Sequence, residues 1–164
     1  MGIRLFSKKT NTYSSEGIKF NLLSGWSIKR SNYPGDKYLG FEISKPALQS
    51  ILWVNLYTAK DLAPDKDYRH PRWLAKRVAA LYNKPLNLWK TPSGQIIEDI
   101  TRFYGNGELY DIFISATAPG VAMVVRGIVS TDIPVKDTRQ LLLTMLSTLS
   151  INNQHPFSGL PLTT

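Results

Sequence analysis

The histidines are the first side chains to test for catalytic or metal-binding chemistry. The chain has two, His70 and His155, which lie 85 positions apart (155 minus 70). A zinc site needs several nitrogen or sulfur ligands, and this sequence contains no cysteine to supply them. A general base also needs a partner that orients it. We therefore expect no metal site, no cofactor and two solvated histidines.

Carboxylates in the second half of the chain offer another chemistry. Glu98 and Asp99 are adjacent on a predicted strand, so their side chains point to opposite faces and cannot form a dyad. Asp111 lies on the next strand, across a short turn, which leaves two alternatives for it and Asp99. The two form a carboxylate pair of the kind that glycosidases use, or they face water beside Arg102 and Arg126 as ordinary cross-strand partners.

The sequence motifs of the common enzyme classes are missing. No serine lies in a Gly-x-Ser-x-Gly elbow, and no glycine-rich loop ends in the lysine of a phosphate-binding loop. The Gly105-Asn106-Gly107 segment lacks the third glycine and the following helix of a dinucleotide site. We therefore expect a protein that is not an enzyme.

A basic and aromatic stripe is the strongest binding feature in the sequence. Pro71 suits a first helical turn, and a helix is predicted from there to Asn83 with one apolar face. The opposite face presents a tryptophan among cations, which suits docking to an acidic surface. Alternatively, the tryptophan lies under the preceding loop and the cations only solvate the helix. The residues of this stripe are Arg72, Trp73, Lys76 and Arg77, and Arg69 joins them if the helix extends that far back.

The distribution of charge indicates the kind of partner. The net charge is +8, and the segment from residue 1 to 82 holds 14 basic against 6 acidic residues, while the remainder holds 6 of each. Such an excess attracts anionic partners. We expect an acidic protein partner, with an anionic membrane surface as the alternative. Nucleic acid is disfavoured because the aromatic strands near Tyr104 also carry acidic residues.

Periodicity predicts the elements that position these residues. Three strands come first, and Trp26 and Trp53 fall among their apolar neighbours as predicted core residues. After the predicted helix, three strands joined by short glycine-bearing turns form an antiparallel meander. An apolar stripe containing Leu142 and Met145 then predicts a final helix. The predicted strands are 17–26, 39–44, 50–58, 95–104, 108–116 and 121–130, and the helices are 71–83 and 135–151.

This order of elements predicts one α+β domain, an antiparallel sheet of about six strands with helices packed on it. Residues 1–12 are expected to form a flexible basic arm, 13–151 the domain and 152–164 a loose tail. The first ten residues hold too few large apolar side chains for a signal peptide, so the expected location is cytoplasmic.

The segments Gly17 to Phe20 and Ser24 to Trp26, with the closing strand and helix over Val121 to Ile151, resemble the PsbP-like fold family. Members of this group commonly have proline where this chain has Ser24. The group includes an extrinsic subunit of photosystem II, bacterial relatives, a Ran-binding factor and type VI secretion adaptors. The resemblance implies an α/β/α sandwich and a role in binding protein partners without catalysis.

Overall fold

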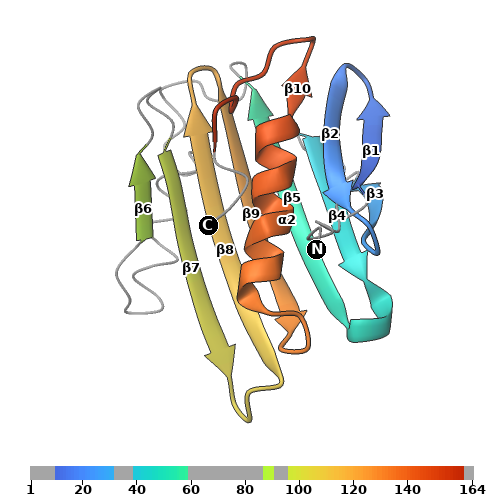
Figure 1. The fold of residues 1–164 in the computed structure, drawn as a ribbon, viewed down its shortest axis with the longest axis vertical. Coiled ribbons are helices and arrows are strands. Elements are labelled where there is room, and N and C mark those ends of the chain that lie inside the picture. Colours follow the sequence, from blue (N-terminus) through green and yellow to red (C-terminus); the bar gives the residue numbers. More distant parts are fainter. Residues whose placement is uncertain (1–9, 32–38, 59–86, 91–95, 161–164) are drawn as a thin grey trace, which may run out of the picture. The chain divides into compact units, whose positions relative to one another are not determined.

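The computed structural model describes residues 10–31, 39–58, 87–90 and 96–160 (Figure 1). The helix predicted over Pro71 to Asn83 lies outside these residues. Contacts divide the chain into two compact units, one formed by Met1–Trp26 with Val135–Thr164 and the other by Ser27–Pro134.

The second unit contains a seven-stranded sheet in the order β3-β4-β5-β9-β8-β7-β6, and every neighbouring pair is antiparallel. The antiparallel prediction is therefore confirmed. A short 3-10 helix, Pro46–Leu48, joins two of the strands. The strands are β3 (Ser27–Ser31), β4 (Leu39–Lys45), β5 (Ser50–Thr58), β6 (Asn87–Lys90), β7 (Ile96–Tyr104), β8 (Leu109–Ala118) and β9 (Val121–Ser130).

The predicted meander of β7, β8 and β9 is confirmed, and its glycine turns explain why. Gly107 has φ +80° and donates its N–H to the carbonyl oxygen of Tyr104 at 2.8 Å. Gly120, between β8 and β9, has φ +74°. L-residues with a β-carbon rarely adopt these angles, so glycine allows each chain reversal to be short.

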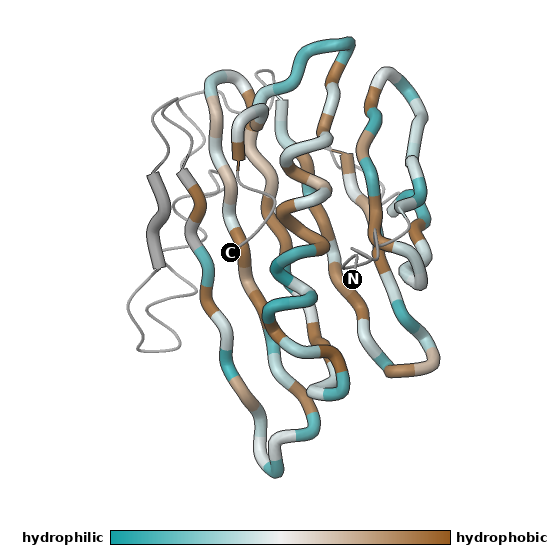
Figure 2. The backbone as a smooth tube through the Cα atoms, in the orientation of Figure 1, coloured by the Kyte–Doolittle hydropathy of each residue, from teal (hydrophilic) through white to brown (hydrophobic). Residues whose placement is uncertain are grey.

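The first face of the large sheet forms an apolar core. Cross-strand pairing aligns Val54, Val125 and Ile114 on β5, β9 and β8, and all three are buried. In the next such row Gly127 lies opposite Leu52, and a β-carbon there would meet the carbonyl oxygen of Ile51. Figure 2 shows hydrophobic residues along these central strands. Burial of branched side chains in this core is the main favourable term for folding of the unit.

The first unit contains a three-stranded sheet and the α-helix α2 (Val135–Thr148). Its strands are β1 (Thr10–Ser15), β2 (Ile18–Leu23) and β10 (Ser150–Ile151), paired antiparallel in the order β1-β2-β10. The predicted apolar face of β2 is confirmed, since Ile18, Phe20 and Leu22 are buried. Helix α2 contacts β2, and the hydroxyl of Thr148 accepts the N–H of Asn21 at 2.9 Å.

Several element boundaries differ from the sequence prediction. The large sheet contains two strands that the sequence did not predict, β3 and β6, and β1 adds another to the smaller sheet. Strands β1 and β3 are mostly polar and show no clear alternation, and β6 has only four residues. Strand β1 begins at Thr10, inside the segment expected to be a flexible arm. The final helix ends at Thr148 rather than at Ile151.

The expected loose tail is also corrected by the structure. Phe157 is fully buried and Leu160 is largely buried, so residues up to Leu160 belong to the packed chain. Asn152 donates its N–H to the carbonyl oxygen of Gly17 at 2.8 Å, which fixes the start of this segment. No helix in the described part of the chain is long and apolar enough to cross a membrane.

The burial of α2 gives a stability prediction. Leu142 is 1% exposed, so Leu142→Ala should lower the free energy of unfolding by about 2–5 kcal/mol. The control is Lys136→Ala on the exposed side of the same helix, which should change it by less than about 0.5 kcal/mol. Urea denaturation measures both. Equal unfolding midpoints for the two variants would show that the helix is oriented wrongly.

Candidate functional site

The residues predicted from the sequence as a docking site all lie outside the described residues. These are Arg69, Arg72, Trp73, Lys76 and Arg77, and His70 lies outside as well. His155 is described and is exposed. Any site in the described residues must therefore be built from other side chains.

The pairing of β7 with β8 rules out the carboxylate dyad. Asp99 lies opposite Ile114, whereas Asp111 lies opposite Arg102. Asp111 and Ile114 are an odd number of positions apart on one strand, so Asp99 and Asp111 point to opposite faces of the sheet. No group of three metal-ligating side chains occurs in the described residues.

The alternative prediction, that Asp99 and Asp111 both face water, is also wrong, because both side chains are buried. Asp99 is 3% exposed on the apolar first face, and Asp111 is 9% exposed on the second face. The predicted cross-strand position of Arg102 opposite Asp111 is confirmed. The hydroxyl of Tyr104 donates a hydrogen bond of 2.9 Å to Oδ2 of Asp111, which compensates part of the cost of burying a carboxylate.

The second face of the sheet brings together arginine, aromatic and aliphatic side chains. Arg126 on β9 lies between Phe113 on β8 and Trp53 on β5. In the neighbouring row Ile128 lies opposite Asp111 on β8, which in turn lies opposite Arg102 on β7. We call the set of Trp53, Arg102, Tyr104, Arg126 and Ile128 the arginine patch.

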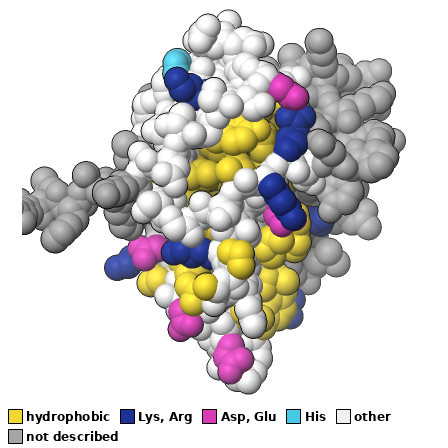
Figure 3. Space-filling view, turned by 90° about the vertical axis from the view of Figure 1, so that its right-hand side faces the viewer, with side chains coloured by type: hydrophobic (Ala, Val, Ile, Leu, Met, Phe, Trp, Pro, Cys, Tyr) yellow, Lys and Arg dark blue, Asp and Glu magenta, His cyan; other side chains and the backbone are white. Residues whose placement is uncertain are grey.

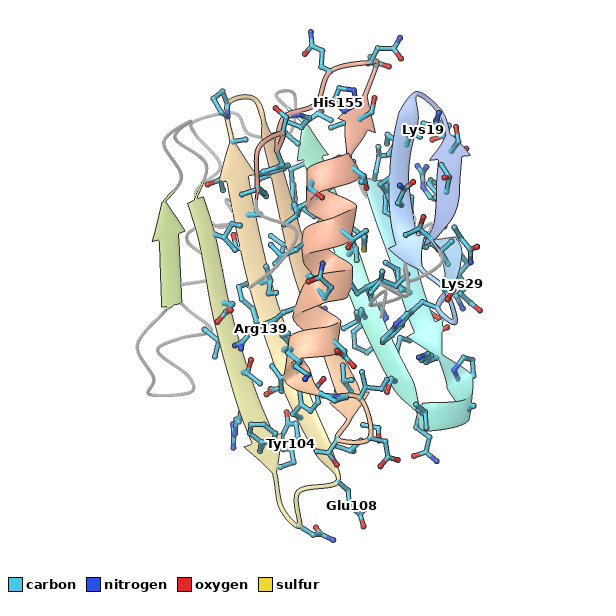
Figure 4. All side chains as sticks on the ribbon, in the orientation of Figure 1. Lys19, Lys29, Tyr104, Glu108, Arg139 and His155 are labelled. Carbon is cyan, nitrogen blue, oxygen red and sulfur yellow. The ribbon has the colours of Figure 1, made fainter. Side chains whose placement is uncertain are left out.

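The apolar members of the arginine patch are open to solvent. Tyr104 and Ile128 are each 38% exposed, and among the described large hydrophobic residues only Phe103 is more exposed. Trp53, predicted as a core residue, is half-buried because it points to this second face. Exposed hydrophobic residues that gather in one place commonly mark an interaction surface. Figure 4 shows Tyr104 close to the β7–β8 turn, which carries Glu108.

The charges around the patch leave one cation without a carboxylate. Glu42, beyond Trp53 in the same row, pairs with Nζ of Lys29 at 2.8 Å. Arg126 is exposed and has no ion-pair partner among the described side chains of residues 10–31, 39–58, 97 and 99–160. Figure 3, which views another side of the molecule, shows basic and acidic side chains lying near one another, so that side has no uniform charge.

Arg102 differs from Arg126 because its surroundings hold it in place. Its guanidinium carbon lies 5.5 Å from the centre of the Tyr104 ring, within the range of a cation–π contact. The same ring donates its hydroxyl proton to Asp111, which lies opposite Arg102. The three side chains therefore form one connected group at the edge of the patch.

A cavity of about 430 Å³ lies at one end of the same sheet. Its lining includes Gln49, Glu108 and Asp132. Next to the cavity, the hydroxyl of Ser50 accepts a hydrogen bond of 2.9 Å from the N–H of Ser130, which is a lining residue. The lining has carboxylates and hydroxyls but no basic residue, which makes it opposite in charge to the arginine patch.

Sequence reasoning assigned Arg126 to carboxylate pairing and overlooked Ile128. A usable signal was present, because both alternate with Val125, Gly127 and Val129, which are buried. An arginine and a large aliphatic residue that share one face of a central strand predict a partly open second face.

Comparison with known proteins bears on the fold. No family model matches the chain, and no curated protein matches it. Among solved structures it is similar to the solution structure of cyanobacterial PsbP (CyanoP) from Synechocystis sp. PCC 6803, with a TM-score of 0.50 and 16% sequence identity. The match covers 92% of this chain and 97% of the other. The chain therefore has a PsbP-like fold, as the sequence resemblance indicated.

The Tyr104–Asp111 bond generates a prediction for a double-mutant cycle. Tyr104→Phe removes the hydroxyl donor to a largely buried carboxylate and should cost about 1–3 kcal/mol of unfolding free energy. In an Asp111→Ala background the same substitution should cost less than about 0.5 kcal/mol, because the acceptor is gone. Chemical denaturation of the four proteins measures the coupling. Equal costs in both backgrounds would mean that the bond contributes nothing.

Proposed function

We propose that this chain is a non-enzymatic binding module that docks an acidic protein partner. One observation carries the proposal: Arg126 is exposed beside Trp53 and Ile128 and has no carboxylate partner among the described residues. Arginine and tryptophan are enriched among the residues that dominate protein interfaces. A partner carboxylate can form two parallel hydrogen bonds with the guanidinium, while apolar neighbours exclude water.

The composition of the patch favours a protein over an anionic membrane or a nucleic acid. An anionic membrane or a nucleic acid binds a protein through many diffuse contacts with a run of basic side chains. Here Asp111 and Glu42 lie in the same two rows as the arginines and reduce the net charge. A folded protein can instead place single carboxylates at chosen positions and avoid the acidic neighbours.

The basic helix face predicted over Arg69 to Arg77 is our second docking surface. Phe113, Val124 and Ile100 are buried on the second face of the sheet, and such burial needs a covering layer. The helix predicted over Pro71 to Asn83 is our proposal for that layer, which gives the finer α/β/α arrangement. Its cations and the arginine patch would then serve one partner.

The test starts with a partner recovered from native lysate and identified by mass spectrometry. Surface plasmon resonance at two ionic strengths then compares Arg126→Glu with the double variant Arg72→Glu, Lys76→Glu. Each should weaken binding about tenfold or more and reduce its salt dependence, because attraction becomes repulsion. Melting temperatures should stay nearly unchanged, since substitutions of exposed charged residues usually alter stability by under about 0.5 kcal/mol.

The matched control is Lys136→Glu, which makes the same charge change at an exposed position on α2 and should bind like the parent. If Arg126→Glu and the double variant Arg72→Glu, Lys76→Glu both bind like the parent, the proposal is overturned. The basic side chains at these positions would then only be solvated. Binding to anionic vesicles that rises with their lipid charge and is lost in the same variants would identify a membrane surface as the partner instead.

A further inference from the structure

The two arginines of the patch are held at a defined separation by the sheet. Arg102 on β7 and Ile128 on β9 belong to one cross-strand row with a single strand between them. Two strand spacings make about 9.6 Å, and the two residues from Ile128 to Arg126 add about 6.8 Å along the strand. The backbone positions of the two arginines are therefore about 12 Å apart, on the diagonal.

The exposed part of this face is narrow. Toward one side, the next row contains Ser115 and Val124, which are buried. Toward the other side, the strands end at Tyr104 and Ser130. The opening is thus about two to three rows wide, or about 7–14 Å. A helix with its side chains has a diameter of about 10–12 Å, so the lower end of this range is little more than half a helix diameter. An extended segment fits over the whole of this range, whereas a helix fits only at its upper end.

We infer that the partner contributes an extended segment in which two acidic residues, four positions apart, flank a central apolar residue. In an extended chain residues i, i+2 and i+4 point to the same side, and i to i+4 spans about 13 Å. The two carboxylates then reach Arg102 and Arg126, and the central side chain lies over β8 between them, beside Ile128. This inference rests on the proposed function and names the chemistry of its partner.

The two ends of the segment contribute unequally. Arg102 already has Asp111 opposite it and the Tyr104 ring beside it, so an incoming carboxylate meets a partly neutralised cation. Arg126 instead has Trp53 and Phe113 opposite it on the two neighbouring strands, and Asp111 lies only on the diagonal. The contact at Arg126 therefore contributes more to binding than the contact at Arg102.

The experiment is a titration of the full chain, labelled with nitrogen-15, with synthetic peptides followed by NMR. The probe is acetyl-Gly-Glu-Thr-Leu-Thr-Glu-Gly-amide, and the matched control carries glutamine in place of both glutamates. The probe should shift the amide signals of residues around Arg126 and Ile128 and bind about tenfold more tightly than its control. Arg126→Gln should weaken it about fivefold or more, and Arg102→Gln should weaken it less.

Three outcomes would overturn the inference. The first is equal binding of the glutamate and glutamine peptides, and the second is equal or tighter binding of a peptide with the glutamates eight positions apart, as a helix would present them. The third is a lack of binding at millimolar peptide. If the whole partner still depends on Arg126 while the peptides fail, only the extended segment is wrong. If the whole partner does not depend on Arg126 either, the proposed function fails with it.

Discussion

The register of β9 between β5 and β8 is the constraint on which the rest of the larger unit depends. Gly127 lies opposite Leu52, where a β-carbon would meet the carbonyl oxygen of Ile51, so a bulkier residue cannot occupy this position without a shift of the strands. A slip by one residue would turn Arg126 into the apolar core and expose the valines that fill it. The same register that closes the core therefore also presents the arginine patch.

The second face shows how a sheet can be stable and still offer a binding surface. Its charges are largely engaged within the fold: Glu42 pairs with Lys29, and Asp111 accepts the hydroxyl proton of Tyr104. These contacts fix side chains before any partner arrives, which lowers the ordering cost of binding. Arg126 remains open for recognition, and its half-buried tryptophan neighbour supplies apolar area that need not be reorganised.

The sequence predicted the elements that carry strong periodic signals. The meander and α2 follow from alternating apolar residues, glycine turns and a helical stripe, and each is present. The sequence did not predict β1 and β3, because these strands are polar and are stabilised by backbone pairing instead of by an apolar face. Faces also escaped prediction: the opposite orientations of Asp99 and Asp111 depend on register, which the residues of one strand do not determine. The predicted basic helix face lies outside the described residues, so its role remains a prediction.

We propose that the partner contacts the second face of the sheet at Ile128. The most direct measurement is site-specific photo-crosslinking with benzoylphenylalanine placed at Ile128 and, as a control, at Lys136, both of which are exposed. We expect the probe at Ile128 to crosslink an acidic protein, and we expect the crosslink to be lost when Arg126→Glu is added. Crosslinks to the partner from the probe at Lys136, with none from Ile128, would contradict it.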